Sequence, residues 1–104
     1  CEALAYANRA GLDPARVLKS IESGAAGSWS LQHLAPRIIQ DDYRPGFYIK
    51  HMLKDLEIAL ESAREMEVRP PGLELARSLY ADMLQAGAGE NGTQALYKWY
   101  EQQA

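Results

Sequence analysis

PGFYIKHMLKDL, residues 45–56, opens the longest helical pattern of the chain, which we expect to run from about Tyr48 to Glu67. At about 100° per residue, apolar side chains recur on one side of this helix and form an ordinary core face. The predicted core face comprises Ile49, Leu53, Leu56, Leu60 and Ala63, with Met52 and Ala59 at its edge. Such a helix needs other elements to cover its apolar side.

The opposite side of the same helix is not plainly a solvent face. Phe47, His51, Lys54 and Ile58 follow one another at spacings of four, three and four residues. One interpretation is that this stripe packs on another helix while Lys54 extends its ammonium group to water. The other is a shallow site in which a cation meets an anionic or carbonyl-bearing ligand beside an aromatic wall. The spacing alone leaves both open.

The rest of the chain also predicts helices. Asp13-Pro14 and Ser28 are helix-start signals, and Pro36 should interrupt or bend the helix that contains it. Sustained alternation of apolar and polar residues is missing, so we predict no strand. The expected helices cover residues 2–10, 14–23, 29–40, 48–67, 73–86 and 93–103. The fold class is therefore all-α, with about six helices joined by short loops.

Composition excludes several classes of function. The chain has 104 residues, which suits one domain, and a formal net charge of -3, which argues against a nucleic-acid or membrane partner. The single cysteine, Cys1, rules out an internal disulfide and favours a reducing, cytoplasmic setting. His33 and His51 share no ligand spacing with each other or with Cys1, so we predict no metal site. Trp29 and Trp99 are expected in core packing or a subunit contact.

The order of several short motifs carries a resemblance. They are EALAYANRAGLDP at 2–14, SGAAGSWSL at 23–31, PR at 36–37, PGF at 45–47, KDLEIAL at 54–60, PGLELARSLY at 71–80 and GENGTQALYKWYE at 89–101. Nearly the whole chain thereby resembles the C-terminal domain of the β-hydroxyacid dehydrogenases. That family includes 3-hydroxyisobutyrate dehydrogenase and tartronate semialdehyde reductase and is related to 6-phosphogluconate dehydrogenase. A phenylalanine followed seven residues later by Lys-Asp-Leu is the most specific element.

The resemblance implies an enzyme of two domains. An N-terminal Rossmann domain would bind NAD or NADP, and the helical domain, residues 1–104 here, would close the cleft and build a homodimer or homotetramer. The pair would move a hydride between the nicotinamide and a small β-hydroxyacid or its semialdehyde. We expect the chain to be part of a longer protein, because it does not begin with methionine and CEALAYANRAG reads as the second half of a helix.

Catalytic residues are not expected within this chain. The family's catalytic lysine, followed four residues later by an asparagine, would lie before Cys1, so we expect the 104 residues to have no turnover alone. We also expect no G-x-G-x-x-G motif in the chain, since GAAG at 24–27 and GAG at 87–89 lack the strand and the spacing that this dinucleotide-binding motif needs.

Site residues are carried over one at a time. Lys54 matches the lysine of the Lys-Asp-Leu motif, which reaches the cofactor near its nicotinamide end, and Phe47 matches the phenylalanine that lines the same cleft. Asp55 is read as structural, pairing with a neighbouring helix or a backbone amide. His51 stands where many relatives carry an aliphatic residue, and Lys50 where many carry an acidic one. We assign His51 to the substrate, and this departure leaves the substrate itself open.

A second hypothesis comes from another class of protein. The Phe47 and Lys54 face would then be the docking groove of a stand-alone helical interaction module. The gene upstream of Cys1 discriminates the two: a glycine-rich strand–turn–helix followed by the lysine and asparagine favours the enzyme, and a nearby start codon favours the module.

Overall fold

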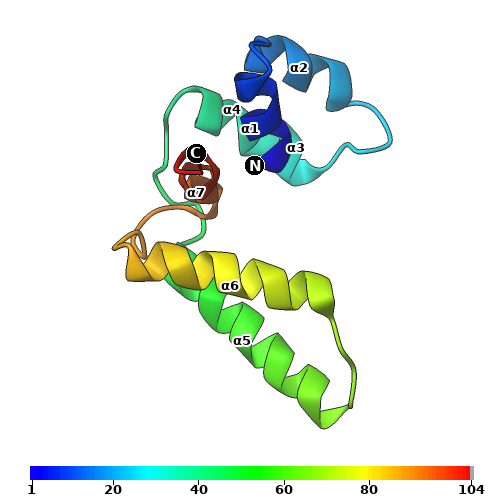
Figure 1. Cartoon of the computed structure of the whole chain (residues 1–104), viewed down its shortest axis with the longest axis vertical. Coiled ribbons are helices and arrows are strands. Elements are labelled where there is room, and N and C mark those ends of the chain that lie inside the picture. Colours follow the sequence, from blue (N-terminus) through cyan, green and yellow to red (C-terminus); the bar gives the residue numbers. More distant parts are fainter. Residues whose placement is uncertain (104) are drawn as a thin grey trace. The chain divides into compact units, whose positions relative to one another are not determined.

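The computed structural model describes residues 1–103, and every regular element in this range is a helix. The elements are α1 (Glu2–Arg9), α2 (Pro14–Ile21), α3 (Trp29–His33), α4 (Ala35–Ile39), α5 (Ile49–Glu65), α6 (Pro71–Gln85), the 3₁₀ helix η1 (Thr93–Leu96) and α7 (Tyr97–Glu101) (Figure 1). The only β pairing in this part of the chain is an isolated antiparallel bridge between Tyr48 and Gly92. The all-α prediction is confirmed. No helix among residues 1–103 is both long and apolar enough to cross a bilayer.

The helix-start signals work as the sequence indicates. The Asp13 carboxylate accepts a hydrogen bond from the Ala15 N–H at 3.1 Å, and Pro14 is the first residue of α2. The Ser28 hydroxyl oxygen accepts one from the Leu31 N–H at 3.0 Å and begins α3. Each bond satisfies an N–H group that the helix itself leaves without a partner.

One expected helix is interrupted as predicted, and two others begin differently. The helix over 29–40 is divided into α3 and α4, which confirms the interruption predicted from Pro36, because proline has no N–H to donate to the preceding turn. The last helix begins as the 3₁₀ turn η1 before α7. Helix α6 starts at Pro71, two residues before the predicted Leu73, since proline is well suited to the first helical position.

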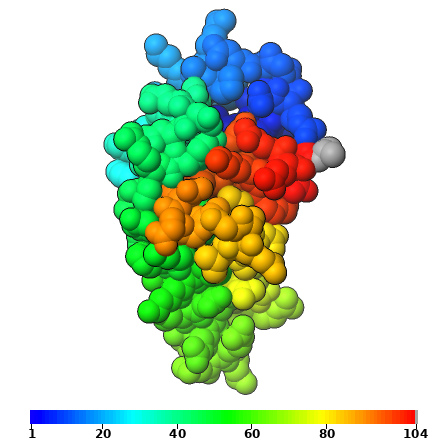
Figure 2. Space-filling model, turned by 90° about the vertical axis from the view of Figure 1, so that its left-hand side faces the viewer, coloured from blue at the N-terminus to red at the C-terminus, as the bar shows by residue number. Residues whose placement is uncertain are grey.

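The chain divides into two compact units, one formed by residues 1–43 with the segment from Gln94 onward, the other by Arg44–Thr93. In the first unit, α1 contacts α2 and α7, and α4 contacts α2 and α3. Its apolar core consists of Leu4, Leu18, Ala35, Ile38 and Tyr97. Figure 2 shows the C-terminal residues lying against the N-terminal helices. The Tyr100 hydroxyl donates to the Glu2 carboxylate at 3.2 Å and adds a polar tie between the same two segments.

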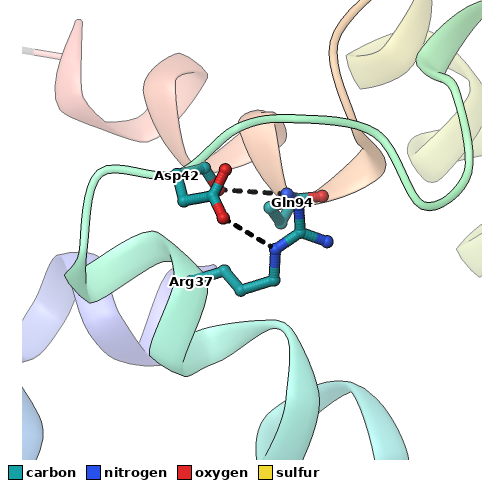
Figure 3. A network of polar contacts seen from close by, with 3 residues as sticks. All are labelled: Arg37, Asp42 and Gln94. Carbon is teal, nitrogen blue, oxygen red and sulfur yellow. Dashed lines mark hydrogen bonds and ion pairs between the residues drawn. The ribbon is translucent and has the colours of Figure 1, made fainter.

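A small polar network joins the two segments of this unit. It connects the end of residues 1–43 to Gln94, where the C-terminal segment begins. Arg37 donates from Nε to the Asp42 carboxylate at 3.3 Å, and the Gln94 side-chain amide donates to the Asp42 carbonyl at 3.1 Å (Figure 3). The Gln94 side chain is buried, so its amide group depends on partners of this kind. The network therefore fixes where the chain enters η1 within this unit.

The second unit is a hairpin of the two longest helices, α5 and α6, which lie side by side (Figure 1). Ile49, Leu53, Leu60 and Ala63 are buried on the inner face of α5. Of the other predicted core residues, Leu56 and Met52 are half-buried, but Ala59 is exposed, which corrects its placement. Met83 is the buried residue of α6. The predicted core face is thus right apart from one edge position.

Shortening the side chain of Ile49 should measure how much the stability of this hairpin depends on the first turn of α5. The side chain is fully buried, so we expect Ile49→Ala to lower the free energy of unfolding by about 2–5 kcal/mol in urea denaturation. Ile58→Ala, on the exposed outer face of the same helix, is the matched control and should change it by less than about 0.5 kcal/mol. Equal effects of the two substitutions would contradict the assigned core face.

Three tyrosines of the first unit have raised pKa values. Burial, the nearby Glu101 and Asp41 carboxylates and a hydrogen bond to Asp41 together raise the pKa of Tyr43 to about 12. Burial is the first cause for Tyr97 and Tyr100 as well, and raises the pKa of each phenol. All three groups are neutral when protonated, so the folded chain retains their protons at a pH at which the unfolded chain loses them.

The consequence is a loss of stability at high pH. The folded pKa of Tyr43 lies above its usual 10.0, so its contribution is complete below that pH and is lost as the pH rises toward about 12. We expect alkaline titration of tyrosinate absorbance to show a late-ionising phenol that disappears in Tyr43→Phe. Titration of all six tyrosines near their usual pKa would contradict this assignment.

Candidate functional site on the outer face of helix α5

The predicted site residues do not all lie on the helix. Helix α5 begins at Ile49, and Tyr48 before it is extended, with φ −79° and ψ 143°. Phe47 therefore precedes the helix, and projecting it onto the helical face at 100° per residue was wrong. The reason is the bridge between Tyr48 and Gly92, which holds this backbone in an extended form.

Phe47 nevertheless reaches the predicted neighbour. Its ring centroid lies 6.2 Å from that of His51, with the planes tilted by 51°. The Tyr48 ring lies 5.3 Å from His51 at 57°. The imidazole thus has an aromatic neighbour on each of the two residues that precede α5, and 42% of the Phe47 surface is exposed. The side chains of Phe47, Tyr48 and His51 thus lie together at the start of the helix, and we call them the aromatic wall.

Lys54 lies one turn farther along the same outer face. His51, Lys54 and Ile58 are all exposed, and their spacings of three and four residues place them on one side of α5. Within residues 1–103, Lys54 forms no ion pair or hydrogen bond. Its ammonium group is therefore open to a ligand, beside an aromatic wall on one side and Ile58, which is 55% exposed, on the other.

Asp55 differs from the prediction. It was expected to pair with a neighbouring helix or a backbone amide, but it is exposed and has no such partner in the described part of the chain. The residue follows Lys54 by about 100° around the helix, so its carboxylate faces water instead of α6.

The glycine pattern at residues 87–92 requires a second correction. GAGENG does spell G-x-G-x-x-G, which the sequence was expected to lack. The pattern follows α6 and not a strand, and it precedes η1. Its Gly89 and Asn91 carbonyls accept hydrogen bonds from the start of α5. A phosphate loop instead presents free N–H groups between a strand and a helix, so this loop lacks the dinucleotide-binding arrangement.

The remaining candidates lie elsewhere. Trp29 is 65% exposed and stacks on His33 with ring centroids 4.6 Å apart, so it is not a core residue as one of its two predicted roles required. Among residues 1–103, no group of three or more His, Cys, Asp or Glu side chains is placed to hold a metal ion. An open groove of about 540 Å³ between α5 and α6 has a charged lining and contains none of the predicted site residues.

Comparison with known proteins agrees with this architecture. The sequence profile described as the NAD-binding domain of NADP-dependent 3-hydroxyisobutyrate dehydrogenase matches residues 1–100. A crystal structure of 3-hydroxyisobutyrate dehydrogenase from Salmonella typhimurium superposes with a TM-score of 0.90 over 94% of this chain and 34% of that one. The two sequences are 24% identical, so this match establishes a shared fold.

Several relatives are closer in sequence. An uncharacterized oxidoreductase of Bacillus subtilis (strain 168) is 56% identical over 97 residues, 93% of this chain and 34% of the relative. Probable 3-hydroxyisobutyrate dehydrogenase-like 1, mitochondrial, of Arabidopsis thaliana is 46% identical, over 91% of this chain and 28% of its own length. For 2-hydroxy-3-oxopropionate reductase of Escherichia coli (strain K12) the identity is 33%, over 96% and 34%.

The chain spans about a third of the length of these relatives. The match nonetheless extends over almost all of residues 1–104 and confirms the resemblance drawn from the motifs. This chain belongs to the NAD-binding domain family of NADP-dependent 3-hydroxyisobutyrate dehydrogenase, the all-α C-terminal domain of that group of oxidoreductases.

Proposed function

We propose that the chain is the helical domain of an NAD(P)-dependent β-hydroxyacid dehydrogenase, in which the outer face of α5 lines the active-site cleft. The observation that supports this most is Lys54. By resemblance it matches the lysine of the family's Lys-Asp-Leu motif, and it is exposed without a partner within residues 1–103. A surface lysine on the same side of the structure as an exposed aromatic group suits a cofactor with polar ribose oxygens and a flat nicotinamide ring.

Each residue of the face has a distinct role in this proposal. The Lys54 ammonium group donates hydrogen bonds to a ribose or amide oxygen of the cofactor, or to the substrate carboxylate, and holds that group in register. Phe47 excludes water from the same edge of the cleft. His51 lies between them and contacts the substrate. The bound cofactor supplies or accepts the hydride, while these residues only bind and orient.

The general acid and base would come from another part of the enzyme. No lysine in residues 1–104 is followed four positions later by asparagine, the pair that the resemblance places on the connecting helix. We therefore expect the 104 residues alone to show no turnover. An N-terminal Rossmann domain is the proposed partner that completes the site, and the cytoplasm remains the location we predict.

The proposed assembly is a homodimer or homotetramer. The second unit exposes several large apolar side chains, namely Phe47, Ile58, Met66, Val68, Leu75 and Leu84. Exposed apolar groups in this number are typical of surfaces that other domains or subunits cover. Small β-hydroxyacids or the matching semialdehydes are the proposed substrates, and the Escherichia coli relative is named for the reduction of such a semialdehyde, 2-hydroxy-3-oxopropionate.

The test is kinetic and uses the full-length protein expressed from its gene. We expect NAD(P)H formation with a panel of β-hydroxyacids, and a fall in kcat/KM of about tenfold or more in Lys54→Ala, mainly through a higher KM for cofactor or substrate. Lys19→Ala is the matched control, because Lys19 is an exposed lysine on α2 outside the proposed site.

Two results would contradict the proposal. Unchanged kinetics in folded Lys54→Ala would make this lysine an ordinary surface residue. A wild-type protein that oxidises none of the β-hydroxyacids and reduces none of the semialdehydes would instead favour the stand-alone interaction module.

A further inference from the structure

The start of α5 is capped by a distant loop and not by a side chain. Tyr48 provides no side-chain hydrogen bond to the first turn. The Ile49 N–H donates to the Asn91 carbonyl at 2.9 Å, and the Lys50 N–H donates to the Gly89 carbonyl at 3.2 Å. Helix-start N–H groups need acceptors, and the negative ends of carbonyl dipoles are favourable at this positive end.

The same loop also fixes the residue before the helix. The Thr93 N–H donates to the Phe47 carbonyl at 3.0 Å, and Tyr48 and Gly92 form the isolated bridge. Residues 47–50 and 89–93 are therefore joined by backbone hydrogen bonds over a short antiparallel stretch. Because the backbone of Phe47 has no helix to hold it, its ring is placed by these bonds.

One ion pair joins the two sides of this stretch. Lys50 Nζ lies 2.6 Å from the Glu90 carboxylate, and the same ammonium group lies 5.3 Å from the centre of the Tyr48 ring. The Tyr48 ring in turn lies 5.3 Å from His51. A chain of contacts thus runs from Glu90 through Lys50 to Tyr48 and His51 of the aromatic wall.

The Lys50–Glu90 ion pair is exposed, so it adds little to the global stability of the fold. The side chains of Lys50 and Glu90 are 41% and 74% exposed, and such pairs contribute at most about 1 kcal/mol. Its effect on geometry is more direct, since it links the loop to the ring beside His51. Gly89 lies close to both helices, because a Cβ atom there would lie 2.7 Å from Leu84 Cδ1 in α6 and 3.6 Å from Lys50 Cβ in α5.

We propose that Lys50 and Glu90 are positioning residues for the cofactor cleft. This role rests on the function proposed above. The Lys50–Glu90 ion pair, which we call the lock, holds the 89–93 loop against the start of α5, so that the aromatic wall keeps a fixed place beside Lys54. Neither residue touches cofactor or substrate. Loss of the lock lets Phe47 and Tyr48 move and weakens cofactor binding, while the chemical step is untouched.

Charge reversal in the full-length enzyme tests the lock. We expect Lys50→Glu and Glu90→Lys each to raise the KM for the nicotinamide cofactor about threefold, with kcat and the melting temperature unchanged. The double reversal should restore KM to within about twofold of wild type, because the pair is re-formed with opposite signs. Glu57→Lys with Arg77→Glu, which reverses an exposed ion pair between α5 and α6, is the matched control and should leave KM unchanged.

The outcomes separate this inference from the function on which it rests. If Lys54→Ala raises KM but the single reversals do not, or if the double reversal fails to restore it, the lock is overturned and the site stands. If neither Lys54→Ala nor the reversals change KM, the proposed site is wrong as well. A wild-type protein that neither turns over β-hydroxyacids nor changes the fluorescence of NADH or NADPH on mixing overturns both.

Discussion

Hydrogen bonds from the first turn of α5 to the carbonyls of Gly89 and Asn91 are the constraint on which the second unit depends. They supply the cap that Tyr48 does not, and they return the chain after α6 to the point where α5 begins. Ile49, the first residue of α5, can be fully buried only because its own N–H group is satisfied there. The hairpin is thus closed at one end by backbone bonds as well as by apolar packing.

The two faces of α5 differ in character. The inner face is an ordinary apolar stripe against α6. The outer face begins with rings held by the loop and continues with Lys54, which has no partner among residues 1–103, and the exposed Ile58. Packing within the hairpin does not explain this mixture. A cation next to aromatic surface is suited to a ligand that has both anionic or carbonyl oxygens and a flat ring. Under the proposed function, this ligand is the nicotinamide cofactor of the dehydrogenase family to which the chain belongs.

Much of the fold was predictable because its signals are local. Asp13, Ser28 and Pro36 act on N–H groups within a few residues of themselves, so their effects on α2, α3 and α4 can be inferred without tertiary information. The buried face of α5 follows from the helical period. Lys54 was recognisable only through the motif around it, since an exposed lysine leaves no periodic signal of its own.

The missed features depend on contacts between residues about forty positions apart. The extended backbone at Tyr48 results from Gly92, and nothing in PGFYIK indicates that partner. The loop 87–92 carries the letters of a phosphate-binding pattern, and the lack of a preceding strand already argued against that role in the sequence. That its carbonyls cap α5 is evident only from the structure. Lys50 was noted as a departure from its relatives, but its partner Glu90 could not be inferred from spacing.

The most direct test of the account is a crystal structure of the full-length protein with its nicotinamide cofactor. The account predicts that Lys54 Nζ lies within about 3.2 Å of a cofactor or substrate oxygen, with the Phe47 ring lining the same cleft. A cofactor bound elsewhere, with Lys54 surrounded by bulk water, would contradict the assignment of this face to the active site.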